Sequence, residues 1–570
     1  MNRSTTEIQK DMFKSLKTIS LSLAALLLGA GSACGQQSDG YAHKVNTLIG
    51  TRGVGLTSGY LYPGATYPFG MVQFTPTYFA KRGGFVINQL SGGGCSHMGN
   101  FPTFPVTGKL DSSPENILDY RVGICGEQGH AGYYEATVQE AVKAQLTVTE
   151  RTGMARYEYP AEDTFGTVII GAGIAATPIE QAAVAITGPN SCEGYAEGGN
   201  FCGIRTPYKV YFVAEFDAQA AETGIWKEER LIPGGRFAEG SESGVYFTFD
   251  LTKNRNVQYK IGVSYVSVEN ARANLAAENA GWDFAAVQHA AEQRWDDYLG
   301  LIEAEGTNPD RTTQFYTHLY RVLIHPNVCS DVNGEYMGAD FKVHKSRSKQ
   351  YTSLSNWDTY RTQIQLLSML APDVASDVVL SHQHFAEQSG GAFPRWVMAN
   401  IETGIMQGDP TPILIANAWA FGAQDYDPFP LFQIMRRNAE VPGAKSQDVE
   451  ERPGLKQYLE KGYYNASEQL EYTSSDFAIG QFALHACGDE FASWRYFHYA
   501  RSWKNLYNPQ TGWLQSRNAD GSWKPLGEDW RESTYKNYFW MVPYDLAGLI
   551  ETMGGKAAAE KRLDEFFVRL

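Results

Sequence analysis

The change of pattern that decides the fold lies in residues 257–302. Residues 257–265, VQYKIGVSY, alternate apolar and polar side chains, and the apolar face holds Val257, Tyr259, Ile261, Val263 and Tyr265. This alternation is typical of a β-strand with one buried face. In residues 282–302, WDFAAVQHAAEQRWDDYLGLI, the apolar side chains instead recur near helical spacing at Val287, Ala291, Trp295, Tyr298 and Ile302. The sequence therefore predicts a β domain followed by helices.

The alternation of period two also recurs upstream of this stretch. It is found in residues 142–148, 210–216 and 245–249, with Gly, Pro and Asn turns between the segments. Short strands separated by turns over so long a region pack best as two facing antiparallel sheets. We therefore expect an N-terminal antiparallel β-sandwich over residues 42–269.

Helical patterns dominate the chain downstream of the sandwich. Asn270 can cap a linker helix over residues 270–305, and a helical domain is expected over residues 306–570. One such helix carries apolar residues at Leu546, Leu549, Ile550 and Met553, with Pro543 at its entry and a Gly-Gly pair at its exit. The predicted class is an α+β multidomain protein.

The chain ends on an apolar stripe at Leu563, Phe566, Phe567 and Leu570. No Gly, Asn or Pro exit signal follows these residues. This pattern predicts that the last helical domain is incomplete at its C-terminus.

The composition excludes two classes of protein. Hydrophobic residues make up 43% and charged residues 19% of the chain, which is the reverse of a disordered composition. The 48 Lys and Arg residues are outnumbered by 63 Asp and Glu residues, for a net charge of −15. Because nucleic acids bind basic surfaces, we expect no nucleic-acid partner.

A short apolar segment near the start predicts export. Ile19–Ala30 follows Lys14 and Lys17, and at about 12 residues it is shorter than the roughly 20 that span a bilayer. Residues 1–33 are therefore predicted to be a signal peptide. Cys34 follows small residues, so it is either an acylated lipoprotein cysteine or a chance residue after an ordinary cleavage site. We expect a periplasmic protein or outer-membrane lipoprotein of a Gram-negative bacterium, which meets the membrane only through this anchor.

The other six cysteines are too sparse for a disulfide scaffold. Cys192 and Cys202 flank a Gly-rich stretch, and they either pair or remain two free buried thiols. No C-x-x-C or H-E-x-x-H spacing occurs, so the sequence predicts no zinc site.

Clusters of carboxylates among aromatic residues are the strongest candidates for a functional site. They cluster in residues 356–361, 394–409 and 523–532. The Gly run at residues 91–96 lacks the Lys and the setting of a phosphate loop, and no G-x-S-x-G motif occurs. Sugars offer apolar faces that stack on rings and hydroxyl groups that bind carboxylates. The clusters therefore favour a carbohydrate site.

Ordered motifs resemble glycoside hydrolase family 92, the calcium-dependent exo-α-mannosidases. Residues 62–73, YPGATYPFGMVQ, are close to the P-G-A-x-x-P-F-G-M-V signature of that family. Residues 90–95, LSGGGC, resemble its L-S-G-x-G-C loop, and residues 45–51, VNTLIGT, resemble its opening. Further segments follow in the order of the family at residues 315–317, 325–331, 357–361, 399–403, 470–476 and 542–549.

The resemblance implies a fold and a mechanism. The fold would be a β-sandwich packed on an (α/α)6 helical barrel, with the site between them. The reaction would be inverting hydrolysis of terminal α-linked mannose in mannose-containing glycans. One carboxylic acid then protonates the leaving oxygen while a carboxylate about 6.5–9.5 Å away activates water. A bound Ca²⁺ would grip the mannose hydroxyls, although the sequence does not identify its ligands.

The resemblance also assigns roles to residues. Glu532 takes the place of the general acid, followed by Ser-Thr-Tyr where the family commonly has Gly-Asn-Ala. Trp357 and Asp358 match the terminal-sugar subsite, although Asp358 can equally cap a helix start. The remaining substrate-binding candidates, each with a structural role as the alternative, are Glu402, Asp409 and Glu471.

Two segments of the family are not found within the 570 residues. They are G-N-D-D-x-G, which supplies the general base, and G-N-E-P, which lies near the leaving sugar. We therefore expect a C-terminally truncated exo-α-mannosidase that is inactive as it stands. The alternatives are a non-catalytic mannose-binding remnant without the general base and a different helical-barrel glycosidase.

Overall fold

The computed structural model describes residues 40–52, 59–77, 84–114 and 123–568. Residues from Gly40 onward form one compact unit. The predicted signal peptide and Cys34 lie outside the described residues. Within the described part of the chain, every helix is too short or too polar to cross a membrane.

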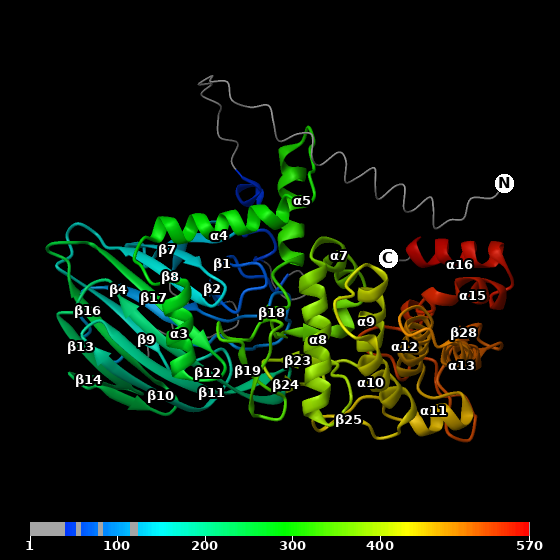
Figure 1. Cartoon of the computed structure of the whole chain (residues 1–570). Coiled ribbons are helices and arrows are strands. Elements are labelled where there is room, and N and C mark those ends of the chain that lie inside the picture. Colours follow the sequence, from blue (N-terminus) through cyan, green and yellow to red (C-terminus); the bar gives the residue numbers. More distant parts are fainter. Residues whose placement is uncertain (1–39, 53–58, 78–83, 115–122, 569–570) are drawn as a thin grey trace, which may run out of the picture. The chain divides into compact units, whose positions relative to one another are not determined.

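The N-terminal part consists of two antiparallel sheets (Figure 1). The first sheet has eight strands, which in spatial order are β1 (Ala65–Thr66), β2 (Gln73–Pro76), β3 (Phe85–Val86), β4 (Thr103–Thr107), β9 (Phe165–Gly171), β16 (Ser243–Asp250), β13 (Glu222–Lys227) and β14 (Arg230–Pro233). The second has nine, in the order β15 (Phe237–Glu239), β10 (Ile179–Gly188), β11 (Ser191–Phe201), β12 (Ile204–Phe216), β17 (Asn256–Ser264), β8 (Thr152–Glu158), β7 (Val142–Val148), β6 (Tyr133–Val138) and β5 (Ile124–His130).

The apolar faces of the two sheets form one buried core. The alternating segments of the sequence lie in β7, β12, β16 and β17, as predicted. Phe216 of the second sheet contacts Phe247 of the first, with ring centroids 4.8 Å apart. The ring centroid of Tyr259 on β17 lies 5.2 Å from that of Phe216. The predicted antiparallel β-sandwich is confirmed, because the alternating side chains of both sheets meet inside it.

Two helices occupy the segment predicted as one linker helix. They are α3 (Val268–Glu278) and α4 (Phe284–Leu299). Ser267 caps α3, so the prediction that Asn270 caps it is wrong. The extended backbone at Ser267 lets its hydroxyl accept the Asn270 N–H. The Asn270 side chain is thereby free to donate to the buried Asp331, 2.8 Å away.

Helix α4 connects the sandwich to the helical part. Trp295 of α4 is fully buried, and its Nε1 donates to the Thr66 carbonyl of β1 at 2.7 Å. Its ring centroid lies 4.5 Å from that of Tyr320 on α5 (Pro309–Val322). One side chain thus contacts both domains.

The C-terminal part is helical, which confirms the predicted fold class. Its longest buried element is α12 (Ala466–His485), which contacts α9 (Thr411–Ala420), α10 (Pro428–Glu440) and α13 (Glu490–Ala500). The other described α-helices of this part are α6 (Asn356–Thr359), α7 (Gln363–Leu370), α8 (Pro372–Ser389), α11 (Leu455–Lys461), α14 (Tyr535–Tyr538), α15 (Leu546–Thr552) and α16 (Lys556–Val568). A helical domain in which α12 packs on three neighbouring helices is consistent with the predicted (α/α)6 barrel.

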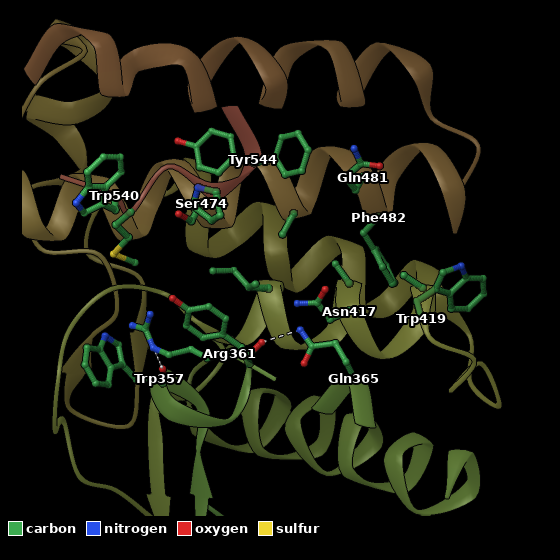
Figure 2. A pocket seen from close by; sticks show the side chains of 18 of the residues that line it. Trp357, Arg361, Gln365, Asn417, Trp419, Ser474, Gln481, Phe482, Trp540 and Tyr544 are labelled. Atoms are coloured by element: carbon green, nitrogen blue, oxygen red, sulfur yellow. Dashed lines mark hydrogen bonds between the residues drawn. The ribbon is translucent and has the colours of Figure 1, made fainter. Parts of the chain in front are cut away.

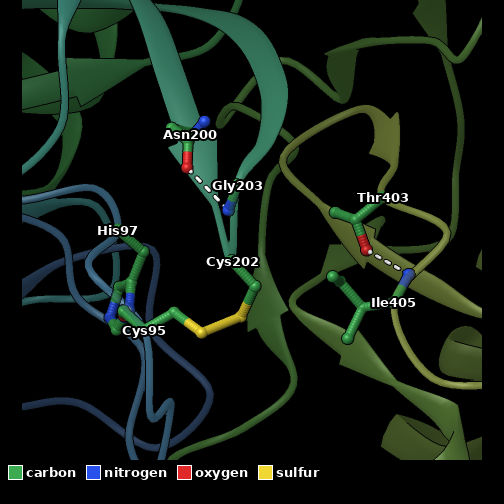
Figure 3. Close-up of a disulfide and its surroundings, with 7 residues drawn as sticks. All are labelled: Cys95, His97, Asn200, Cys202, Gly203, Thr403 and Ile405. Carbon is green, nitrogen blue, oxygen red and sulfur yellow. Dashed lines mark hydrogen bonds between the residues drawn. A yellow bond between two sulfur atoms is a disulfide. The ribbon is translucent and has the colours of Figure 1, made fainter.

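One disulfide of the described residues links two loops of the sandwich, and neither alternative from the sequence describes it fully: Cys192 is free, but Cys202 is bonded. Cys202, at the turn between β11 and β12, bonds to Cys95, with Cα atoms 5.2 Å apart (Figure 3). Cys192 is a free buried thiol on β11. The stretch from Cys192 to Cys202 is a strand, so the two residues are about 30 Å apart, far beyond disulfide reach.

Candidate active site

A cavity of ≈ 1150 Å³ opens in the helical domain (Figure 2). It is lined by residues 357–365, which include parts of α6 and α7, by α9 and the turn after it, by α12 and by the segment of residues 531–544. All lining residues lie between Trp357 and Tyr544, so the described wall comes from the helical domain. Its size and its mixture of rings and polar groups suit a small polar ligand.

Trp357 lines the cavity from the one-turn helix α6. Its Nε1 donates to Oε1 of Glu471 at 2.8 Å. The Arg361 guanidinium lies 4.4 Å from the Trp357 ring centroid, and its Nε donates to the Trp357 carbonyl at 3.0 Å. The indole is therefore held at its edge by a carboxyl group and on one face by a cation.

Asp358, predicted beside Trp357 in the sugar subsite, is exposed and is not among the lining residues of the cavity. Its carboxylate accepts a hydrogen bond from the Ser355 hydroxyl. Ser355 immediately precedes α6, so this contact belongs to the start of that short helix. Asp358 thus lies in the first turn of α6, and no side chain caps a backbone N–H at the start of that helix.

Glu471 lies on α12, fully buried behind Trp357. The Tyr360 side chain also interacts with the Glu471 carboxyl group. Burial raises the pKa of Glu471 to about 7, although Arg361 and the Trp357 N–H partly oppose this shift. Near neutral pH, the group therefore exists in both its acid and its carboxylate form.

Glu532 lines the cavity with an exposed side chain. Its φ of 49° lies in the left-handed region, which residues other than Gly rarely adopt and which is frequent at functional sites. Hydrogen bonds hold the surrounding segment. The Tyr538 hydroxyl donates to the Arg531 carbonyl at 3.2 Å, and the Trp530 indole donates to the Leu526 carbonyl at 2.7 Å.

Tyr538 lies within electrostatic reach of both carboxyl groups. Burial raises the pKa of Tyr538, and Glu471 and Glu532 raise it further. Arg361 and Arg531 oppose this shift. The cavity wall therefore brings Glu532, Arg361, Arg531 and Tyr538 together, with Glu471 buried behind it.

Glu402 and Asp409 are buried in the framework of the helical domain and do not line the cavity. The Glu402 carboxylate accepts backbone N–H groups of Arg395, Trp396 and Gly404. Asp409 accepts from Asn438 and from Arg452, each at 2.9 Å. Because protein donors occupy the carboxylate oxygens of Glu402 and Asp409, both residues have the contacts of structural carboxylates.

The residues that line the cavity do not by themselves form a calcium site. Ca²⁺ takes about 6–8 oxygen ligands, several of them carboxylates. Glu532 is the one carboxylate among the lining residues, and Arg361 and Arg531 bring positive charge. An uncommitted amide oxygen is present, since Oε1 of Gln365 is buried without a partner.

Sequence reasoning missed several residues of the cavity. Arg361 lies in the motif of residues 357–361, and Tyr538 lies six residues after Glu532, but neither was named as a site residue. Asn417 of α9 and Gln481 of α12 also line the wall, without any sequence signal. Only the packing of α9 against α12 brings these two amides to the same cavity.

Comparisons with known proteins agree on one family. Residues 44–264 match the glycosyl hydrolase family 92 N-terminal domain, and residues 270–570 match the glycosyl hydrolase family 92 catalytic domain. A curated relative from Arthroderma benhamiae, described as an uncharacterized secreted glycosidase, is 24% identical. That match covers 91% of this chain and 73% of the relative.

Solved structures of similar fold come from Bacteroides thetaiotaomicron. The family GH92 α-mannosidase BT3965 is 26% identical with a TM-score of 0.84, covering 92% of this chain and 74% of its own. The family GH92 inverting mannosidase BT2199 is also 26% identical with a TM-score of 0.84, covering 93% of this chain and 74% of its own. A structure of BT3965 in complex with mannoimidazole has a TM-score of 0.83 and 25% identity, covering 92% of this chain and 73% of its own.

Proposed function

Because the chain belongs to glycosyl hydrolase family 92, and is therefore a glycoside hydrolase, we propose that it is an exported exo-α-mannosidase. It would release terminal α-linked mannose from glycans. The substrate class is supported by the two solved relatives described as mannosidases, one of them with a bound mannose-like inhibitor. Export is supported by the apolar leader of this chain and by the curated relative described as secreted.

Glu532 is the general acid of the proposed reaction. Among the residues that line the cavity it is the one carboxyl group, and its left-handed backbone carries the side chain on a segment held by Tyr538 and Trp530. As an acid it would give its proton to the leaving glycosidic oxygen while water attacks the sugar carbon from the opposite face. The product sugar then has inverted configuration. The position of Glu532 in the cavity is the observation that carries this proposal.

Trp357 is the proposed platform for the terminal sugar. Arg361 covers one face of its indole, and the ring lines the cavity. An indole face stacks well on the apolar C–H face of a hexose. Glu471 acts as a positioning residue, because its carboxyl oxygen fixes the Trp357 Nε1. Asp358, Glu402 and Asp409 have no substrate contact in this proposal.

Calcium assistance is part of the proposal on the family resemblance alone. A bound Ca²⁺ would supply a Lewis acid that grips sugar hydroxyls. The described lining residues do not provide the oxygen donors for such an ion, so no step of the mechanism is derived through it.

A second candidate function is mannose binding without turnover. It is favoured by the single carboxylate among the lining residues, because an inverting mechanism needs an acid and a base. Glu471 is the nearest described alternative to a second group, but its carboxyl is buried behind Trp357.

The test compares Glu532→Gln with the unaltered chain on an aryl α-mannoside and on α-mannobioses. Loss of general acid catalysis should lower the rate on mannobioses about 10²–10⁴-fold, and less on the aryl substrate, whose leaving group needs little protonation. The control is Glu528→Gln, a neighbouring exposed acid that does not line the cavity. Assays with added calcium and with a chelator test the calcium part.

Three outcomes separate the candidates. Measurable rates that are equal for Glu532→Gln and the unaltered chain on both substrates would remove Glu532 from its role. An unaltered chain that binds mannose by calorimetry but hydrolyses neither substrate, with or without calcium, would support the binding function. Hydrolysis rates that change neither with added calcium nor with the chelator would remove calcium from the proposal.

A further inference from the structure

Three metal-binding side chains that do not line the cavity meet where the first described residues contact helix α4. They are His43 on the short helix η1 (Tyr41–Lys44), His130 at the end of β5 and Glu292 on α4. One ligand atom of each lies within 4.8 Å of the others. Among the described residues, this is the one group of three or more His, Cys, Asp or Glu side chains with such spacing.

The distances suit a shared small cation. Nε2 of His130 lies 2.7 Å from one Glu292 oxygen, and Nε2 of His43 lies 3.9 Å from the other. Ligands about 2.1 Å from a tetrahedral zinc ion are about 3.4 Å apart, which falls between these two values. Ligand separations of 2.7 Å and of up to 4.8 Å would have to change by roughly 0.7–1.4 Å to bring all three side chains to one ion. The proton of the His130–Glu292 hydrogen bond would be released on binding.

The backbone around the three residues is fixed before any ion binds. The Ala42 N–H donates to Asp296 of α4 at 2.7 Å, and the Ala131 N–H donates to the Ala42 carbonyl at 3.3 Å. Gly40 lies so close to α4 that a Cβ atom there would be 2.1 Å from the Asp296 carboxylate. These contacts hold helix η1, the end of β5 and α4 in fixed positions relative to one another.

Neighbouring side chains orient the ligands themselves. The Tyr133 ring stacks on His130 with centroids 5.1 Å apart, and the Gln288 amide donates to Glu292 at 2.7 Å. Such outer contacts are typical of metal sites, where they fix the ring and carboxylate orientation.

The group is accessible to a metal ion from solvent. The His43 side chain is 42% exposed, whereas His130 and Glu292 are 18% and 12% exposed. Water can therefore fill a fourth coordination position on the His43 side. The result is a half-buried three-ligand site with one open position.

We propose that His43, His130 and Glu292 bind a divalent transition-metal ion of the zinc class, which cross-links η1, the sandwich and the linker helix. Two imidazoles and one carboxylate suit zinc, copper, nickel or cobalt better than calcium, which prefers oxygen ligands alone. The site is separate from the cavity and does not rest on the proposed mannosidase function. Its role is structural, because it joins three segments that are distant in the sequence.

The test measures metal binding by the full chain, produced without a polyhistidine tag. Equilibrium dialysis against Zn²⁺ should give one ion per chain, and Co²⁺ should give the visible absorption bands of a tetrahedral site. His43→Ala removes the exposed ligand without disturbing the core and should weaken Zn²⁺ affinity at least about tenfold. The control is His318→Ala, which changes an exposed histidine on α5.

Thermal unfolding gives a second measurement. Zn²⁺ at about a hundred times its dissociation constant should raise the melting temperature of the unaltered chain and of His318→Ala. It should raise that of His43→Ala and of Glu292→Gln clearly less, because a site at least about tenfold weaker is less occupied at the same Zn²⁺ concentration; Glu292→Gln keeps the shape of the carboxylate but loses its charge. The proposal is overturned if His43→Ala and Glu292→Gln bind Zn²⁺ as tightly as the unaltered chain. It is equally overturned if the unaltered chain binds no ion or is not stabilised.

Discussion

At the scale of single residues, the ionisation of Glu471, which lies behind the cavity wall, makes the stability of the fold depend on pH. Its carboxyl is fully buried, and burial raises its pKa to about 7. A carboxyl whose pKa is higher in the folded than in the unfolded state binds its proton more tightly when folded. Its contribution to stability is therefore complete below about pH 4.5 and is lost as the pH rises through 7.

The first prediction concerns Glu471→Gln. An uncharged amide keeps an oxygen for the Trp357 Nε1 but does not ionise. We expect the free energy of unfolding of the variant to rise relative to the unaltered chain as pH increases from 5 to 8. A shift from 4.5 to about 7 corresponds to a relative gain on the order of 3 kcal/mol.

The measurement is denaturant unfolding of both proteins at pH 5, 6, 7 and 8. Glu460→Gln, an exposed acid on α11, is the matched control and should follow the unaltered chain. A constant difference between Glu471→Gln and the unaltered chain over this range would show that Glu471 does not titrate there.

At the scale of elements, the Cys95–Cys202 disulfide joins the β11–β12 hairpin to the loop between β3 and β4. The tip of this hairpin reaches the helical domain, because Phe201 lies 4.6 Å from Trp396, ring centroid to centroid. Trp396 belongs to β23 (Trp396–Met398), which pairs with β24 (Ile401–Glu402), where Glu402 is held. The disulfide thus tethers the part of the sandwich nearest the framework of the cavity.

The second prediction concerns the double variant Cys95→Ala, Cys202→Ala. The bond closes a loop between residues 107 positions apart, so its loss should lower stability by about 2–5 kcal/mol. The melting temperature of the unaltered chain should fall on addition of a reductant, and that of the double variant should not. Cys125→Ala, which removes an exposed free thiol, is the control and should leave both results unchanged. Equal melting temperatures for the double variant and the oxidised unaltered chain would contradict a stabilising bond.

At the scale of the whole molecule, the proposed export determines the redox conditions in which the protein folds. A disulfide such as Cys95–Cys202 persists in an oxidising compartment, which agrees with export. The leader and Cys34 lie outside the described residues, so membrane attachment is a proposal from the sequence.

The third prediction concerns that attachment. If Cys34 is acylated, the protein should be recovered with membranes, and Cys34→Ala should move it to the soluble fraction. Cell fractionation followed by immunoblotting measures this distribution, with Cys125→Ala as the control that should stay membrane-bound. Recovery of the unaltered protein in the soluble periplasm alone would mean that Cys34 is a chance residue after a cleavage site.

The sequence by itself determined the order of the two domains. Side-chain periodicity is a local property, so the strands of residues 142–148, 210–216 and 257–265 and the helix that holds Trp295 could be predicted from spacing alone. The family could also be identified, because its motifs are contiguous stretches of sequence. Glu532 and Trp357, named on those motifs, both line the cavity.

Only the tertiary structure decided which of the predicted acids are in reach of a ligand. Glu402, Asp409 and Glu471 look alike in the sequence, yet backbone N–H groups and Arg452 hold the first two in the framework, while Glu471 lies behind Trp357 and accepts from its Nε1. The Cys95–Cys202 pair and the meeting of His43, His130 and Glu292 were equally hidden. Burial, partners and proximity between distant segments depend on how whole sheets and helices pack, and no local spacing carries that information.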